Sequence, residues 1–153
     1  MAFLLLVGFI IYPSAFIIEL YKCLKCLSQD LVIMSDLPPL NTDTIWAILN
    51  EEIDDAIVNQ LVWHYLGYRY SQADRTWNKE QVIDDWAEKY PDPPDFIANR
   101  PPTVKLTRSI PKENKQLLKQ KLGFQGYKLG EFGPRQTRRA TAANWLLSYM
   151  ETH

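Results

Sequence analysis

Cysteine is almost absent from this sequence of 153 residues, and both copies, Cys23 and Cys26, lie near the N-terminus. From residue 34 onward there is none, which excludes a disulfide scaffold, a cysteine nucleophile and a thiolate metal site in that part of the chain. The two cysteines have the spacing of half a zinc site, but no second pair completes one. We therefore expect no bound metal and no other cofactor.

Histidine and the short motifs of common enzyme classes are equally scarce. His64 is the one histidine before the C-terminal residue, and it lies in the apolar, aromatic segment VWHYLGY. The sequence has no phosphate-binding glycine loop, dinucleotide fingerprint, HExxH motif or GxSxG nucleophile. A lone histidine in such a segment is typical of a structural residue. We expect no catalytic residues, and an enzyme that uses His64 and its neighbouring tyrosines is kept only as a third hypothesis.

Charge is missing from residues 2–18, which are dense in Leu, Ile, Phe and Val. This stretch approaches the roughly 17–25 residues that a membrane span needs. If it is an anchor, Lys22 and Lys25 after it place the body on the cytoplasmic side. The interpretation we favour is that Met34 is the natural start of a cytoplasmic protein and that residues 1–33 are an upstream extension. In both cases residues 34–153 are expected to form a single globular domain.

Hydrophobic spacing and turn residues predict a mostly α domain of about five helices, with at most a short β-hairpin or two-stranded element. The helices are expected near residues 42–50, 51–66, 78–89, 109–122 and 134–150. Gly67 and Gly123 are suited to end two of them, and Pro134 to begin the last. The alternation in TVKLTRSI, residues 103–110, favours a strand, and a second candidate strand covers residues 127–132.

The net charge of −1 is the sum of two segments of opposite charge. Residues 34–99 contain four basic and thirteen acidic side chains, a net charge of −9, whereas residues 100–153 contain eleven basic and three acidic ones, a net charge of +8. Such a split favours either an acidic face docked on a basic one or two faces for different partners. The residues we expect to contact a partner or an anion are Lys105, Arg108, Tyr127, Lys128, Arg135, Arg138 and Arg139.

Three of these residues, Arg135, Arg138 and Arg139, share one face at the start of the last predicted helix. A helix N-terminus carries partial positive charge, so each arginine there is unfavourable by about 0.3–1 kcal/mol. An anion is therefore expected to compensate them. It is either an external group, such as a phosphate or a carboxylate cluster, or the acidic half of the same chain, and the sequence does not decide between the two.

The preferred function is that of a non-enzymatic interaction or accessory protein that binds an acidic protein surface through this basic, glycine- and aromatic-rich region. Arginine and tyrosine are frequent anchors of protein interfaces. The alternative is RNA or another nucleic acid bound by the same surface, because cations interleaved with aromatic rings suit a single strand. A membrane becomes a partner only if residues 1–33 are an anchor.

Several segments of the body resemble one known family. They are HYLGYRY, YPDPPDFIANRPPTVKLTRSIP, ENKQLLKQKLGF and, the most specific, GYKLGEFGPRQTRRATAANWLLSYM. Together they resemble domain-of-unknown-function 1823 (DUF1823), a family of cyanobacteria and their plastid relatives, over about residues 37–150. The resemblance implies a setting, the cytoplasm of an oxygenic phototroph or the plastid stroma, but no activity and no catalytic residues.

Overall fold

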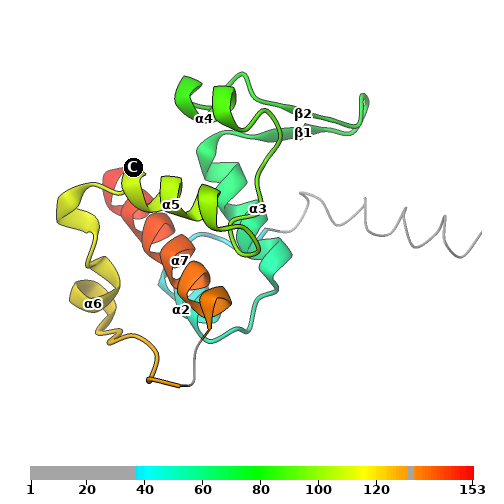
Figure 1. Cartoon of the computed structure of the whole chain (residues 1–153). Helices are drawn as coiled ribbons and strands as arrows, with labels where there is room; N and C mark the ends of the chain where they lie inside the picture. Colours follow the sequence, from blue (N-terminus) through cyan, green and yellow to red (C-terminus); the bar gives the residue numbers. More distant parts are fainter. Residues whose placement is uncertain (1–36, 131–132) are drawn as a thin grey trace, which may run out of the picture. The chain divides into compact units, whose positions relative to one another are not determined.

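The computed structural model describes residues 37–130 and 133–153 (Figure 1). The predicted extension or membrane segment at residues 1–33, both cysteines and Met34 lie outside these residues. The described part contains six α-helices and one two-stranded antiparallel sheet, which confirms the prediction of a small, mostly α domain. None of the described helices is both long enough and apolar enough to cross a membrane.

The longest of the described helices, α7 (Pro134–Thr152), runs through the middle of the fold (Figure 1). It packs against α2 (Thr42–Leu49), α3 (Asp55–Leu66), α5 (Arg100–Ser109) and α6 (Leu117–Leu122). Because these helices cover it on several sides, every residue from 142 to 148 is buried, including Asn144 and Ser148. The helix is therefore buried on more than one face along this stretch, whereas Ala140 and Met150 on either side of it are only half-buried.

The helix ends follow the expected chemistry. Asn41 precedes α2, and its Oδ1 accepts a hydrogen bond of 2.9 Å from the backbone N–H of Thr44. Gly67 and Gly123 end α3 and α6 in the left-handed conformation, with φ of 106° and 67°. At Gly67 the constraint is double, because a Cβ there would lie 2.3 Å from the backbone oxygen of Gln81.

The two strands are β1 (Arg69–Ser71) and β2 (Thr76–Asn78), which pair antiparallel with Tyr70 opposite Trp77. Aromatic contacts hold this hairpin, since the Trp77 ring lies 5.2 Å from that of Tyr70 and 5.4 Å from that of Trp63. The predicted strand at residues 127–132 was wrong as far as residues 127–130 are described, because they form a turn without strand structure.

The predicted strand at residues 103–110 was also wrong, because α5 covers residues 100–109. Two prolines occupy its first turn, where the missing N–H groups need no partner and the fixed φ suits a helix. The buried residues Thr103, Leu106 and Ile110 recur at helical spacing, which the alternating pattern concealed. Thr103 Oγ1 also donates to the carbonyl of Phe96 at 2.6 Å, which ties the start of the helix to the core.

Two further helices are shorter than predicted. The expected helix at 78–89 is limited to α4 (Asp84–Lys89), and Ile83, just before it, is 67% exposed. The expected helix at 109–122 is divided into the 3-10 helix η1 (Lys112–Asn114) and α6. Most of the residues that these shorter helices leave out are exposed.

Candidate anion-binding site

Arg139 is fully buried beneath the connection between α2 and α3. Its guanidinium donates to the carbonyl of Ile48 from Nε at 3.1 Å and from Nη2 at 2.9 Å, and Nη2 also donates to the carbonyl of Ile53 at 2.6 Å. Nη1 donates to the carboxylate of Asp55. These groups all belong to the acidic half of the chain, so internal pairing supplies the compensation that the sequence left open for this arginine.

Arg135 extends the same network at the surface. Its Nε and Nη2 donate to the two carboxylate oxygens of Asp55 at 2.7 and 2.9 Å, and its Nη1 pairs with Glu51. Burial acts to raise the pKa of Asp55, but hydrogen bonds and charge from Arg135 and Arg139 outweigh it and hold the pKa below its ordinary value. Asp55 therefore stays ionised and links α3 to α7.

Two other predicted contact residues of this region also donate hydrogen bonds to the protein's own backbone. Arg138 Nη1 donates to the carbonyls of Ile97 and Ala98 at 2.9 and 3.0 Å, and the Tyr127 hydroxyl donates to the carbonyl of Leu49 at 3.0 Å. Burial raises the pKa of Tyr127 above its ordinary value. Lys128 lies exposed in the turn before α7.

The seven predicted residues do not lie together. Arg138 meets the segment that leads into α5, whereas Ser109 at the other end of α5 accepts a hydrogen bond from Trp145 Nε1. Trp145 lies seven positions after Arg138 on α7, which corresponds to about 10 Å along the helix axis. Lys105 and Arg108, near that far end of α5, therefore form a site of their own.

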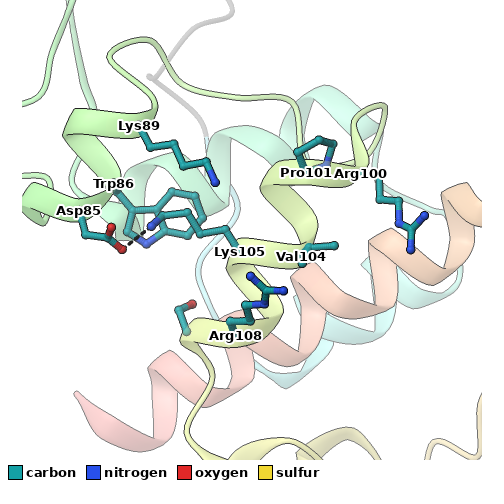
Figure 2. Close-up of a pocket in the computed structure, with 9 residues that line it drawn as sticks. Asp85, Trp86, Lys89, Arg100, Pro101, Val104, Lys105 and Arg108 are labelled. Carbon is teal, nitrogen blue, oxygen red and sulfur yellow. Dashed lines mark hydrogen bonds and ion pairs between the residues drawn. The ribbon is translucent and has the colours of Figure 1, made fainter.

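That site is a pocket of about 600 Å³ between α4 and α5, which we call the basic pocket (Figure 2). Its charged lining consists of Asp85, Lys89, Arg100, Lys105 and Arg108, and Trp86 forms part of its wall. Figure 2 shows Lys89 from α4 and Arg108 from α5 directed toward the space beside Trp86, with Lys105 between them.

Lys105 is the fixed cation of this pocket. It pairs with Asp85, and its Nζ lies 4.9 Å from the centre of the Trp86 ring, a cation–π contact. Lys89, Arg100 and Arg108 are exposed, and none of them forms an ion pair with a described side chain. Four cations and one carboxylate, which Lys105 already holds, are therefore the described charged groups that line the pocket, so it is suited to an anionic group.

Sequence reasoning selected Lys105 and Arg108 but missed the contribution of Lys89 and Trp86. The strand assigned to residues 103–110 placed Lys105 and Arg108 on opposite sides. On a helix, Pro101, Lys105 and Arg108 recur at intervals of four and three and share one face. The two prolines after Asn99 were the signal for that helix start. Lys89 and Trp86 reach the pocket only through tertiary packing.

Other chemistry has little support in the described part of the chain. It contains no group of three His, Cys, Asp or Glu side chains that could hold a metal. The buried Nδ1 of His64 has no hydrogen-bond partner among the described residues. Burial, assisted by the charge of Arg69, lowers the pKa of His64 below its ordinary value, which keeps the ring neutral near pH 7.

Comparison with known proteins places this fold in a family. The family model described as "Domain of unknown function (DUF1823)" matches residues 39–151. The chain belongs to the DUF1823 family. A protein whose structure was determined by solution NMR is 54% identical to it, with a TM-score of 0.67 over 73% of this chain and 93% of that one. No curated protein sequence gave a significant match.

Proposed function

We propose that this DUF1823 protein is a non-catalytic accessory protein that binds an acidic segment of a partner protein in the basic pocket. The observation that carries the proposal is the charge of that pocket. Lys89, Arg100 and Arg108 lack an ion pair among the described residues, although the chain as a whole is slightly acidic. The setting we propose is the cytoplasm of an oxygenic phototroph or the plastid stroma.

The lining of the basic pocket favours a carboxylate-rich protein over RNA. Single-stranded RNA is bound by stacking its bases on open aromatic rings. Trp86 is 3% exposed and its ring is covered by Lys105, so it offers no stacking surface. Asp84, Asp85 and Glu88 on α4 are exposed next to the pocket and repel a continuous phosphate backbone. Separate carboxylates of a peptide are able to pair with the cations and avoid these groups.

Fluorescence anisotropy with two labelled probes of similar charge tests the proposal. One is a peptide of twelve Asp and Glu residues, and the other is a single-stranded RNA of twelve nucleotides. We expect the peptide to bind more tightly. Arg108→Gln and Lys89→Gln should each weaken peptide binding about two- to fivefold, as expected when one exposed ion pair is lost.

The matched control is Lys112→Gln, which removes an exposed lysine that lies outside the basic pocket. This substitution changes the net charge by the same amount as Arg108→Gln. It therefore distinguishes binding in the basic pocket from a general electrostatic effect. Equal weakening by Lys112→Gln and Arg108→Gln would contradict the proposal. Tighter binding of the RNA, with the logarithm of its association constant falling linearly with the logarithm of the salt concentration, would indicate that the partner is a nucleic acid.

A further inference from the structure

A second pocket, of about 540 Å³, adjoins the basic pocket and shares Trp86 and Ser109 with it. We call it the aromatic pocket. It lies between the C-terminal ends of α3 and α7, and Tyr65, Trp145 and Tyr149 line it. The Tyr149 ring lies 4.8 Å from that of Tyr65 and 5.9 Å from that of Trp145. These contacts hold the rings in place without filling the pocket.

The aromatic pocket differs in chemistry from its neighbour. Among the described residues, no Asp, Glu or Lys side chain lines it, and one arginine does. This residue, Arg69, donates through Nη1 to the carbonyls of His64 and Tyr68 at 2.7 and 2.9 Å. Ile83 at its edge is 67% exposed. An exposed aliphatic side chain beside fixed aromatic rings is typical of the apolar centre of a protein interface, which a charged rim surrounds.

We propose, on the basis of the function proposed above, that the two pockets form one docking site for an acidic peptide segment with a large apolar side chain. The carboxylates of the segment lie in the basic pocket, and its apolar side chain, best an aromatic one, enters the aromatic pocket beside Ile83. The shared wall at Trp86 and Ser109 makes this possible. Three or four extended residues, which span about 10–14 Å, carry a peptide past one tryptophan side chain.

Physical reasons favour such a segment over a purely acidic one. Exposed ion pairs steer a partner and orient it, but they contribute little net affinity because both charges lose hydration. Binding energy comes chiefly from large apolar side chains that are withdrawn from water near the centre of an interface. The basic pocket therefore supplies orientation, and the aromatic pocket supplies the anchor.

The experiment measures peptide binding to the full chain by fluorescence anisotropy. Three labelled acidic peptides of twelve residues carry one Phe at position 4, 7 or 10, and three matched peptides carry Ser there. We expect at least one Phe peptide to bind about tenfold or more tightly than its Ser counterpart, since burial of the ring removes a large apolar surface from water.

Two variants of the protein locate the anchor. Ile83→Ser should weaken the tight Phe peptide at least about fivefold and leave its Ser counterpart unchanged, a coupling that a double-mutant cycle measures directly. Leu129→Ser is the matched control, because Leu129 is 95% exposed and lines neither pocket. It should change neither peptide.

The outcomes separate this inference from the function on which it rests. If the Phe and Ser peptides bind equally and Arg108→Gln weakens both, the proposal of an acidic partner is supported and the aromatic anchor is refuted. If no acidic peptide binds, the proposed function fails as well. If the chain forms dimers that Ile83→Ser dissociates, a second copy occupies the aromatic pocket and the inference is overturned.

Discussion

Replacement of Arg139 by methionine tests the internal pairing of the arginines. Arg139 is fully buried and donates four hydrogen bonds, two to Ile48 O, one to Ile53 O and one to Asp55. Methionine is unbranched and flexible and packs well in irregular buried space, but it is shorter than arginine and donates none of these bonds. If these contacts join α7 to the α2–α3 connection, Arg139→Met should lower the free energy of unfolding without changing the fold.

The magnitude follows from the groups left behind. Removal of one partner from a buried ion pair costs about 3–5 kcal/mol. Asp55 keeps its ion pair with Arg135 and its side chain is 35% exposed, so this full cost does not apply to it. The lost hydrogen bond to its carboxylate contributes about 1.5–3 kcal/mol. The carbonyl of Ile53 loses its donor, at about 1–3 kcal/mol, whereas Ile48 O still accepts from Glu51 N at 3.3 Å. The expected loss is about 4 kcal/mol, or about 10–20 °C in Tm for a domain of this size.

Urea denaturation followed by circular dichroism measures the loss, with thermal unfolding as a second readout. Arg138→Met is the matched control, because this neighbouring arginine is only half-buried and its two bonds to carbonyls lie nearer solvent. It should cost about 1 kcal/mol or less. Equal losses in the two variants, or a loss below about 1 kcal/mol for Arg139→Met, would refute the role assigned to Arg139.

Three further predictions concern stability. Gly67→Ala should cost about 2 kcal/mol or more because φ is 106° and the new Cβ meets Gln81 O, whereas Gly123→Ala, with open space around it, should cost about 1 kcal/mol, both measured in urea. The lowered pKa of His64 means that the unfolded chain binds its proton first, so stability should fall as pH drops below about 6.5, and His64→Phe should remove this slope. Because the pKa of Asp55 is lowered in the folded protein, its contribution to stability is present above the ordinary pKa of 3.8 and is lost as the pH falls further. Asp55→Asn should remove this part of the dependence of Tm on pH, measured by thermal unfolding at a series of pH values below about 4.

The ends of several helices were predictable from nearby residues in the sequence. Asn41 caps α2, Gly67 and Gly123 close α3 and α6 with positive φ, and Pro134 begins α7. These positions were predictable because a cap or a left-handed residue depends on atoms only a few positions away along the chain. The mostly α class followed for the same reason, from the helical spacing of apolar residues.

Segments in which two periodicities compete were predicted less well. In residues 103–110, alternate residues differ in polarity, so the pattern matches a strand, yet Thr103, Leu106 and Ile110 also match a helix. The two prolines in the first turn of α5 and the hydrogen bond from Thr103 to Phe96 O favour the helix. Because the strand assignment separated Lys105 from Arg108, it also concealed the basic pocket.

The sequence by itself determined the helical class, the positions of the caps and the division of charge between an acidic and a basic half. Only the tertiary structure decided how that charge is used. Arg135 and Arg139 meet Glu51 and Asp55 across about 80 residues of chain, whereas Arg108 finds no carboxylate among the described residues. The physical reason is that an ion pair depends on distance in space, and that distance is set when α7 packs against α2, α3 and α5.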